Sequence, residues 1–351
     1  MSEILNIILI TGGPSAERDV ALSSSRSILK SLRELGHNVK VIDPVYGDES
    51  VSEEKIFEDK VSGEYPSAEK LLEIRRTADR NILRCFNSDL FNDTDFVFLG
   101  LHGKFGEDGK IQSLLDLRHI KYTGSDYFAS ALAFNKEVAK IIFSNNNIPT
   151  PRWMFSLSEE EALSEEFLKK IIKQLGFPIV VKPDDDGSSV GITILKNEND
   201  YEAYSIAVQL AFNYSDKVLF EKYVEGKELT VSILGDEAYP VVEIRPKNGI
   251  YDYEHKYTKG MTEYFCPAEL TESETKRIQH LALTAHRALG CKVYSRVDFL
   301  QSNYDKEFYC LEVNTLPGMT ETSLVPKSAK AKGMEFTQLI DKLIKLSVEK
   351  Y

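Results

Sequence analysis

The sequence predicts an α/β protein whose first domain is a parallel sheet covered by helices. Short apolar runs alternate with helical segments from the start of the chain, beginning with ILNIILI at residues 4–10. A strand–helix–strand alternation of this kind places the strands parallel. The length of 351 residues exceeds what one ordinary hydrophobic core organises, so we expect two or three domains.

The elements of the first domain can be assigned in order. Residues 4–10 form a buried strand, and a helix follows TGGPSAERDV and extends to about Leu35, where Gly36 provides the C-cap. VKVID and TDFVFLG are the next strands. Residues 47–92 are charged and weakly patterned, and we assign them no chemistry.

Two further units follow. The second begins near Lys136, passes through the turn-rich NNNIPTP and contains the strands FPIVVKP, GITILK and KVLFEKYV. The third begins near Lys227 with ELTVSILG. It continues with a Tyr-rich loop at residues 247–266, an amphipathic helix near residues 273–289, a polar-faced hairpin and a C-terminal helix.

Composition excludes several classes of protein. Asp and Glu outnumber Lys and Arg by 55 to 43, which gives a net charge of -12 and argues against nucleic acid or an anionic membrane as partner. No apolar run approaches the ~20 residues of a membrane span. MSEILNIILITGG lacks a basic leader and reads as a core strand, and the four cysteines form no C-x-x-C pair. We therefore expect a cytoplasmic protein with reduced thiols.

The hairpin YSRVDFL–QSNYDKEF–YCLEVN carries polar residues on one face. Strand side chains alternate between faces, so Arg296 and Asp298 share a face. A turn centred near residue 305 places Asp298 opposite Glu312, and Arg296 opposite Asn314. A solvated polar face is the plain alternative. The oxygens of Asp, Glu and Asn are, however, the ligand set of Mg²⁺ and not of zinc, so a metal site with a nucleotide beside it is our hypothesis.

The stretch VVKPDDDGSSVGIT, residues 180–193, combines a glycine-rich loop with three carboxylates. Lys182 ends a strand with its stem buried, and phosphate is the anion that we expect beside its ammonium group. We interpret Asp184–Asp186 as solvated bystanders without a metal role, and Ser188 with neighbouring backbone N–H groups as phosphate donors. An ordinary hairpin with a surface lysine is the alternative.

LFEKYVEGKE combines a strand with a glycine-containing turn. A strand edge offers a donor and an acceptor to the edge of an adenine ring. The carboxylates of Glu221 and Glu228 could then accept hydrogen bonds from the adenine amino group and the ribose hydroxyls. Alone, this signal is weak.

These residues together resemble the D-alanine–D-alanine ligases of the ATP-grasp superfamily over nearly the whole chain. The matching stretches, in order, are GGPSAERDVALSS, LHGKFGEDGKIQSLLD, YTGSDYFASALAFNK, FPIVVKPDDDGSSVG, EKYVEGKE, YDYEHKYTKGMTEYFCPA, GCKVYSRVDF and LEVNTLPGMTETSLVPK. The resemblance implies an α/β, three-domain ATP-grasp fold with an N-terminal Rossmann-like parallel-sheet domain. The implied limits are 1–126 for that domain, 127–226 for the central subdomain and 227–351 for the C-terminal subdomain, with ATP held between the last two.

The resemblance also assigns site residues. It implies two Mg²⁺ ions, with Mn²⁺ as an alternative metal, on Asp298, Glu312 and Asn314, with Glu312 bridging. It implies nucleotide contacts for Lys136, Lys182, Glu221, Lys222, Val224, Glu228 and Lys256. It implies substrate contacts for Glu17, His102, Lys256, Arg296, Gly318, Ser323 and Leu324, and catalytic roles for Glu17, Ser188, Tyr257, Arg296, Gly318 and Ser323.

The implied reaction joins two D-alanine molecules at the expense of ATP, through an acyl phosphate, for peptidoglycan precursors. A homodimer is implied as well. The same fold can make D-alanyl-D-serine or D-alanyl-D-lactate. Tyr257 favours the peptide, because family members that prefer D-lactate carry His at this place.

Proteins of other classes fit the sequence less well. A nucleotide-binding regulator without activity would be expected to lack Arg296, Lys182 or a metal ligand, and all of these are present. An extracytoplasmic solute-binding protein would need a signal peptide.

Overall fold

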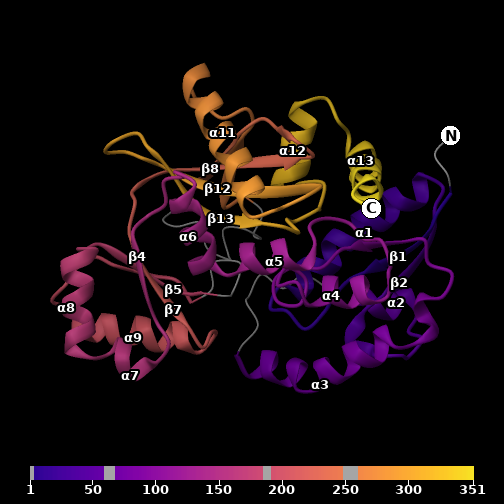
Figure 1. The fold of residues 1–351 in the computed structure, drawn as a ribbon, viewed down its shortest axis with the longest axis horizontal. Coiled ribbons are helices and arrows are strands. Elements are labelled where there is room, and N and C mark those ends of the chain that lie inside the picture. The colour runs from indigo at the N-terminus through magenta and orange to yellow at the C-terminus, as the bar shows by residue number, and fades with distance from the viewer. Residues whose placement is uncertain (1–3, 59–67, 185–190, 248–259) are drawn as a thin grey trace.

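The computed structural model describes residues 4–58, 68–184, 191–247 and 260–351, and three sheets organise these residues (Figure 1). They have three, four and six strands. No helix in the described ranges is long and apolar enough to cross a membrane. Helices accompany each sheet, so the α/β class expected from the sequence is confirmed.

The N-terminal sheet is parallel, which confirms the prediction from the strand–helix alternation. Its order is β2-β1-β3, formed by β1 (Asn6–Ile10), β2 (Asn38–Ile42) and β3 (Phe96–Leu99). Helix α1 (Arg18–Glu34) ends before Gly36, whose φ of +87° is the left-handed conformation of a helix C-terminus. Residues 47–92, left without a role above, include the helices α2 (Glu53–Ile56) and α3 (Ala68–Phe86).

The four-stranded sheet is antiparallel and forms the lobe at the left of Figure 1. Its order β4-β7-β5-β6 comes from β4 (Trp153–Ser156), β5 (Ile179–Pro183), β6 (Thr193–Leu195) and β7 (Val218–Lys222). Its helices are α7 (Glu159–Ala162), α8 (Glu165–Gln174) and α9 (Tyr201–Phe212). Phe220 of β7 packs its ring against Phe167 of α8 and Tyr204 of α9, at centroid distances of 5.2 and 6.1 Å. This aromatic contact fixes the helices on the sheet.

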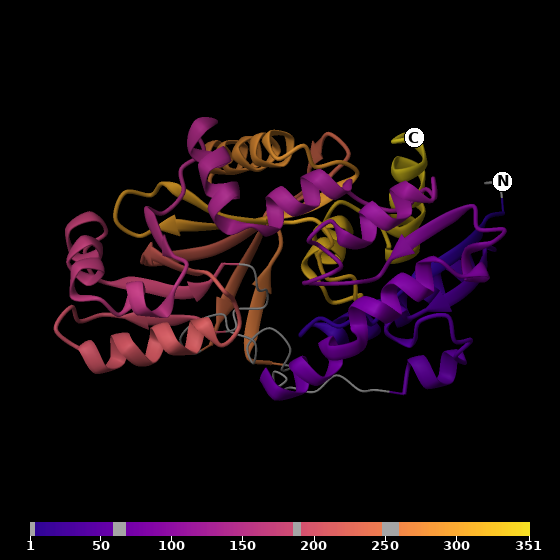
Figure 2. The ribbon, with the colours of Figure 1, turned by 60° about the horizontal axis from the view of Figure 1, so that its bottom comes forward.

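The six-stranded sheet is also antiparallel. It lies between the lobe of the four-stranded sheet and the region of the N-terminal sheet, as Figure 2 shows. Along the order β11-β10-β8-β12-β13, with β9 paired to β8, its strands are β8 (Gly226–Leu234), β9 (Glu237–Ala238), β10 (Val242–Pro246), β11 (Thr262–Phe265), β12 (Tyr294–Ser302) and β13 (Phe308–Asn314). Helices α5 (Tyr127–Phe134), α6 (Lys136–Asn145) and α11 (Glu272–Ala288) share one buried apolar cluster with it.

The buried clusters cross the expected domain limits at two places. Ala129 and Phe143, from α5 and α6, pack with the six-stranded sheet and not with the four-stranded one. Helices α12 (Leu324–Ala331) and α13 (Phe336–Glu349) add Val325 and Leu339 to the core of the N-terminal sheet. The clusters change near residues 126 and 226, but these two segments join the core of another predicted domain, so the three-part division remains a prediction.

Candidate active site

The β12–β13 hairpin brings the predicted polar residues to one face. The register places Asp298 opposite Glu312 and Arg296 opposite Asn314, as the alternation and the turn position predicted. Val297, between Arg296 and Asp298, is fully buried on the other face. The sequence therefore fixes both the face and the pairing of these four side chains.

Asp298 is held in one orientation by donors from three strands. Arg296 donates from Nε to Oδ1 at 2.9 Å and from Nη2 to Oδ2 at 2.7 Å, both along β12. Thr230 Oγ1 on β8 donates to Oδ1 at 2.6 Å, and Asn314 Nδ2 on β13 donates to Oδ2 at 3.1 Å. The carboxylate is consequently fixed before any ligand arrives.

Glu312 is the more open of the two carboxylates. Its side chain is 32% exposed against 13% for Asp298. Its Oε2 lies 3.9 Å from Nζ of Lys136, the first residue of α6. Lys136 also donates to the backbone oxygen of Asp184 at 3.2 Å, so one lysine connects the hairpin to the end of β5.

The donor set suits a magnesium ion. The facing groups are two carboxylates and one amide, all with oxygen ligands. In the described part of the chain, no group of three or more His, Cys, Asp or Glu gathers as a metal site. A metal on this hairpin would therefore need phosphate oxygens and water as its other ligands, which is the usual situation of Mg²⁺ beside a nucleotide.

Glu228 of β8 lies on the same face of the sheet. It precedes by two residues Thr230, which hydrogen-bonds to Asp298, so the two β8 side chains point the same way. Between them, Leu229 is fully buried on the opposite face. The predicted ribose-binding carboxylate is thus brought to the face that carries the predicted metal ligands.

Asp184 corrects the interpretation of the aspartate loop. We expected a solvated side chain, but Asp184 is only 1% exposed. Its Oδ1 accepts the N–H of Glu137 at the start of α6 at 3.1 Å, and its Oδ2 lies 3.6 Å from Nζ of Lys217. The side chain therefore anchors a helix end and a lysine. Asp185 and Asp186 lie outside the described residues.

Lys182 is buried, as predicted, but its partner is a carboxylate. Its Nζ lies 2.8 Å from Oε2 of Glu221 on the neighbouring β7. Oε1 of Glu221 pairs with Lys140 of α6. Burial acts to raise the pKa of Glu221, but the charges of the two lysines outweigh it and hold the pKa below its usual value. Sequence reasoning missed Lys140, although it follows Lys136 by one helical turn.

The expected strand edge for adenine is not an edge. Strand β7 lies between β4 and β5, so both of its sides are paired. The N–H of Lys222 donates to Arg152 O at 2.8 Å, and that of Tyr223 donates to Pro178 O at 3.1 Å. These donors are unavailable to a base, and a base would have to meet backbone groups from Val224 onward or carbonyl oxygens.

Hydrogen bonds connect the loop after β13 to the N-terminal domain. The N–H of Leu316 donates to Glu107 Oε1 at 2.9 Å, and its carbonyl accepts from His102 Nδ1 at 2.7 Å. Ser24 of α1 receives the N–H of Met319 at 3.2 Å and lies 3.0 Å from His102 Nε2. Because a carbonyl only accepts, Nδ1 carries the proton and Nε2 accepts from the serine. Burial lowers the pKa of His102 to about 4, so the ring is neutral.

Glu107 was missed by sequence reasoning and lies beside the predicted Glu17. It is 8% exposed, and its Oε2 accepts the N–H of Gly103 at 3.0 Å. Burial, then the charge of Glu17, raises the pKa of Glu107 to about 7. A Cβ on Gly103 would lie 2.6 Å from Glu17 Oε2, so only glycine allows this approach. No local pattern marked Glu107, because its partner Leu316 is 209 residues away.

Gly318, Ser323 and Leu324 meet at the start of α12. Ser323 Oγ accepts the N–H of Thr320 at 3.0 Å, and a Cβ on Gly318 would lie 3.2 Å from that oxygen. The Ser323 side chain makes no capping hydrogen bond to the helix. The first N–H groups of an α-helix have no partner within the helix, so this end suits an anion.

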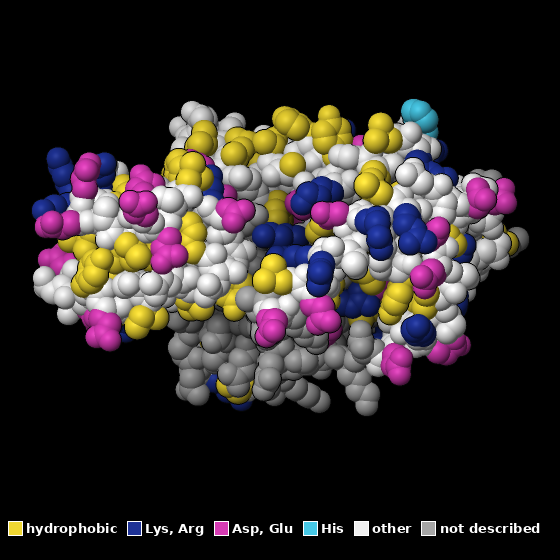
Figure 3. All heavy atoms as spheres, turned by 90° about the horizontal axis from the view of Figure 1, so that it is seen from below, with side chains coloured by type: hydrophobic (Ala, Val, Ile, Leu, Met, Phe, Trp, Pro, Cys, Tyr) yellow, Lys and Arg dark blue, Asp and Glu magenta, His cyan; other side chains and the backbone are white. Residues whose placement is uncertain are grey.

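Three predicted residues lie outside the described part of the chain: Ser188, Lys256 and Tyr257. Their roles stay predictions. Figure 3 shows Lys and Arg side chains gathered near the middle of the face seen from below.

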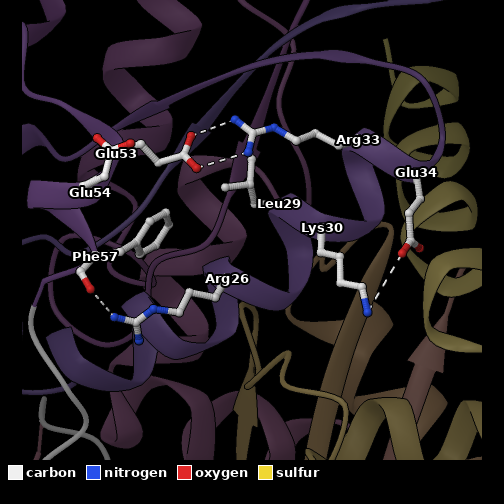
Figure 4. Close-up of a pocket in the computed structure, with 8 residues that line it drawn as sticks. All are labelled: Arg26, Leu29, Lys30, Arg33, Glu34, Glu53, Glu54 and Phe57. Atoms are coloured by element: carbon white, nitrogen blue, oxygen red, sulfur yellow. Dashed lines mark hydrogen bonds and ion pairs between the residues drawn. The ribbon is translucent and has the colours of Figure 1, made fainter.

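A separate hollow of about 720 Å³ lies on the outer side of α1 and α2 (Figure 4). Arg33 and Glu53 form a two-pronged ion pair at 3.1 and 2.7 Å across it, and Lys30 lies 3.9 Å from Glu34. Its lining residues are Arg26, Leu29, Lys30, Arg33, Glu34, Glu53, Glu54 and Phe57. None of these is a predicted site residue, so we give the hollow no part in the chemistry.

Comparisons with known proteins agree over both halves of the chain. The family model for the D-ala D-ala ligase N-terminus matches residues 6–125, and the one for the C-terminus matches residues 142–345. The D-alanine–D-alanine ligase of Halalkalibacterium halodurans is 39% identical over 99% of this chain and 100% of its own length. That of Aquifex aeolicus is 39% identical over 97% of this chain and 100% of its own length.

Solved structures agree in the same way. The D-alanine–D-alanine ligase from Bacillus anthracis complexed with ATP has a TM-score of 0.74 and 31% identity, covering 99% of this chain and 98% of its own. The VanG D-Ala:D-Ser ligase from Enterococcus faecalis has a TM-score of 0.76 and 29% identity, covering 98% of this chain and 100% of its own.

Proposed function

The chain belongs to the D-alanine–D-alanine ligase family, and from this membership we propose that it joins two D-alanine molecules into D-alanyl-D-alanine while ATP is cleaved to ADP and phosphate. The dipeptide serves as a precursor of peptidoglycan. Two steps account for the reaction. A carboxylate oxygen of the first D-alanine attacks the γ-phosphorus, and ADP leaves. The amine of the second D-alanine then attacks the acyl phosphate, and phosphate leaves as a proton is lost.

ATP binds between the four-stranded and six-stranded sheets in this proposal. Lys136 and Lys182 contact the phosphates, and Glu221 accepts from the adenine amino group. Glu228 binds the ribose, on the sheet face that also carries Asp298. In this proposal the nucleotide extends from β5 and β7 of the four-stranded sheet to the β12–β13 hairpin.

Asp298, Glu312 and Asn314 would hold Mg²⁺, or Mn²⁺, and the family resemblance implies two ions at these residues. The metal supplies positive charge to the transferring phosphoryl group. Support comes from the oxygen ligands of two carboxylates and one amide, which the register brings to one face of the hairpin.

The first D-alanine lies against the N-terminal domain. The Glu17 carboxylate pairs with its ammonium group, and the neutral ring of His102 forms part of the wall. The hydrogen bonds of His102 and Glu107 to Leu316 keep that wall aligned with the loop after β13. The carboxylate of this substrate then points toward the γ-phosphate.

The developing oxyanion and the second D-alanine are bound by the loop after β13. Arg296 and the Gly318 N–H stabilise the negative charge on the attacked carbonyl oxygen. Lys256, Ser323 and the Leu324 N–H bind the carboxylate of the second substrate, and the start of α12 suits such an anion. By the family resemblance, Glu17, Ser188 and Tyr257 act together as a triad, and we propose that they help to exclude water from the acyl phosphate.

The single observation that carries this proposal is the face formed by Arg296, Asp298, Glu312 and Asn314 in a chain that matches the family at both ends. The test is phosphate release by the full chain with ATP and Mg²⁺, with the product identified by mass spectrometry. We expect release that depends on D-alanine and yields its dipeptide. ATP cleavage that does not respond to D-alanine would contradict the proposal.

D-alanyl-D-serine is the second candidate product, because a D-Ala:D-Ser ligase is 29% identical over almost the whole chain. Mixtures of D-alanine with D-serine or D-lactate, in the same assay, decide between the products. We expect the dipeptide of D-alanine to dominate, since a neutral phenol at Tyr257 does not repel the incoming ammonium group. We further propose a cytoplasmic homodimer, which size-exclusion chromatography with light scattering would test.

A further inference from the structure

Three charged side chains form a cluster in the interior of the lobe built on the four-stranded sheet, on its side next to α6. Lys140 comes from α6, Lys182 from β5 and Glu221 from β7, and their side chains are 0%, 10% and 4% exposed. Each lysine contacts a different oxygen of the carboxylate: Lys140 contacts Oε1, and Lys182 contacts Oε2 at 2.8 Å. The cluster therefore holds two cations for one anion.

The two lysines differ in how fully they are bound. The Lys140 ammonium donates to Thr150 Oγ1 at 2.6 Å and to Pro151 O at 3.1 Å, and it pairs with Glu221. These contacts are two hydrogen bonds and one ion pair. Its Nζ also lies 5.3 Å from the ring centre of Trp153. An ammonium group enclosed in this way is not accessible to a ligand.

Lys182 has a simpler environment. Its described partner is Glu221 alone, which leaves donors for another anion. If Lys182 turned to a phosphate, Glu221 would still be compensated through Oε1 by Lys140. Without Lys140, the same movement would leave a buried carboxylate unpaired, which is strongly unfavourable.

We propose that Lys140 is a positioning residue for base recognition, which balances the charge of Glu221 and fixes its orientation. When ATP binds, Lys182 leaves Oε2 of Glu221 and contacts a phosphate. Oε2 then accepts a hydrogen bond from the amino group of adenine. The proposal rests on the proposed function, because it requires that ATP occupies this site. Lys140 itself touches neither base nor phosphate. An ionised Glu221 favours the 6-amino group of adenine and repels the 6-carbonyl oxygen of hypoxanthine.

The test measures the binding of ADP and of IDP to the full chain with Mg²⁺, by isothermal titration calorimetry. In Lys140→Met we expect ADP affinity to fall about 10- to 100-fold, the size of a lost charge-assisted contact. We expect the ADP-to-IDP preference to fall at least about tenfold, since a protonated Glu221 donates to the hypoxanthine oxygen. A folded variant with an unchanged preference overturns the proposal.

A second variant separates charge from packing. Lys140→Gln keeps hydrogen-bonding capacity but not the charge, so we expect it to behave like Lys140→Met. If Lys140→Gln behaves like the unmodified protein, the charge of Lys140 is not needed. The side chain then only fills space and hydrogen-bonds to Thr150 and Pro151, and the proposal fails. Thermal unfolding confirms that each variant is folded, and the milder Gln variant carries the test if Met does not fold.

Lys350 offers a matched control far from the cluster. It is half-buried and donates to Gly124 O at 3.0 Å, with its Nζ 3.9 Å from the ring centre of Tyr122. We expect Lys350→Met to leave the ADP-to-IDP preference unchanged. An equal loss in this variant would show that any buried lysine has the effect, which overturns a specific role for Lys140.

A double variant asks whether Lys140 acts through Glu221. Glu221→Gln alone should abolish the preference for ADP, and adding Lys140→Met should then change the preference less than about twofold. A further loss as large as in the single variant contradicts the proposal. Failure of the unmodified protein to bind ADP, or to release phosphate with D-alanine, would instead refute the proposed function itself.

Discussion

Two arginine–carboxylate pairs in the six-stranded sheet have the same spacing along their strands and different surroundings. Arg296 and Asp298 lie two residues apart on β12, and Glu243 and Arg245 lie two residues apart on β10. The first pair faces Glu312 across the hairpin. Glu243 instead lies opposite Leu229, whose side chain belongs to the buried apolar cluster, so this pair points to the other side of the sheet.

The difference lies in the groups that surround each carboxylate. Arg245 and Lys227 lie 2.5 and 3.7 Å from Glu243, so that acid meets cations. Asp298 meets one cation and, directly opposite, a second acid. Lys136 lies 3.9 Å from Glu312, and a further cation bound beside the two acids would stabilise both carboxylates. We therefore interpret an acid surrounded by cations as a structural ion pair. An ion pair with a second acid directly opposite is a candidate metal site.

The strongest test replaces one acid from each environment. Glu312→Gln removes one of the facing charges, and we expect turnover to fall at least about a thousandfold, or about 4 kcal/mol, with the fold kept. Glu243→Gln should keep turnover within about tenfold and instead lower the melting temperature. Steady-state kinetics and thermal unfolding measure both. Normal turnover in a folded Glu312→Gln would remove the distinction between the two pairs.

The arginines give the second contrast. Arg296→Ala should lower kcat about 100- to 1000-fold, because it removes a donor to the developing oxyanion and an orienting partner of Asp298. Arg245→Ala should change kcat less than about threefold, because Arg245 is 39% exposed and bonded only to structural acids among the described residues. The kinetics of the two variants decide the matter, and equal losses would show that the arginines serve the sheet alike.

Glu107 and Glu17 extend the comparison to a second pair of acids and predict a pH effect. Burial and the Glu17 charge raise the pKa of Glu107 to about 7 from 4.5. The folded protein therefore binds this proton more tightly than the unfolded chain. The stabilisation is complete below pH 4.5 and is lost as the pH rises through about 7.

We expect the free energy of unfolding to fall by about 2–3 kcal/mol more between pH 5 and pH 8 in the unmodified protein than in Glu107→Gln. Urea unfolding at the two pH values measures this difference. Glu17→Gln is the control, and it should lower the apparent pKa of Glu107. Parallel pH profiles for the unmodified protein and Glu107→Gln would show that Glu107 is not protonated in the fold.

We expect the smallest effect on turnover from a substitution of Asp184. Like Glu243, this acid is surrounded by groups that compensate its charge, namely the Glu137 N–H and Lys217. Asp184→Asn keeps an acceptor for Glu137 N–H but loses the charge near Lys217. We expect a loss of about 1–2 kcal/mol in the free energy of unfolding and turnover within about tenfold. A loss of turnover like that of Glu312→Gln would assign Asp184 to the metal or phosphate site.

The hairpin was predictable because its information is local. The alternation along residues 294–314 and the position of the turn determine which side chains share a face, and the register follows. The parallel N-terminal sheet followed from the strand–helix order in the same way. The end of α1 at Gly36 needed only the conformational preference of glycine.

The failures involve partners distant in the sequence. Strand β7 read as an edge because strand order within a sheet is not written in the strand itself. Asp184 read as solvated because its partners Glu137 and Lys217 come from other elements. The expected phosphate contact of Lys182 stays a prediction, but its partner Glu221 could be identified only once β5 and β7 were paired.

The contribution of α13 to the N-terminal core has a consequence for synthesis on the ribosome. Leu339, Leu343 and Ile344 of α13 pack in the same cluster as Ile8 and Leu29, and Thr337 Oγ1 donates to Glu34 Oε2 of α1 at 2.9 Å (Figure 1). The residues that begin this core leave the ribosome first, and those that complete it emerge only after the entire ATP-binding region. Part of the apolar surface of the parallel sheet therefore stays exposed in the nascent chain, where chaperones can bind it, until α13 has been synthesised.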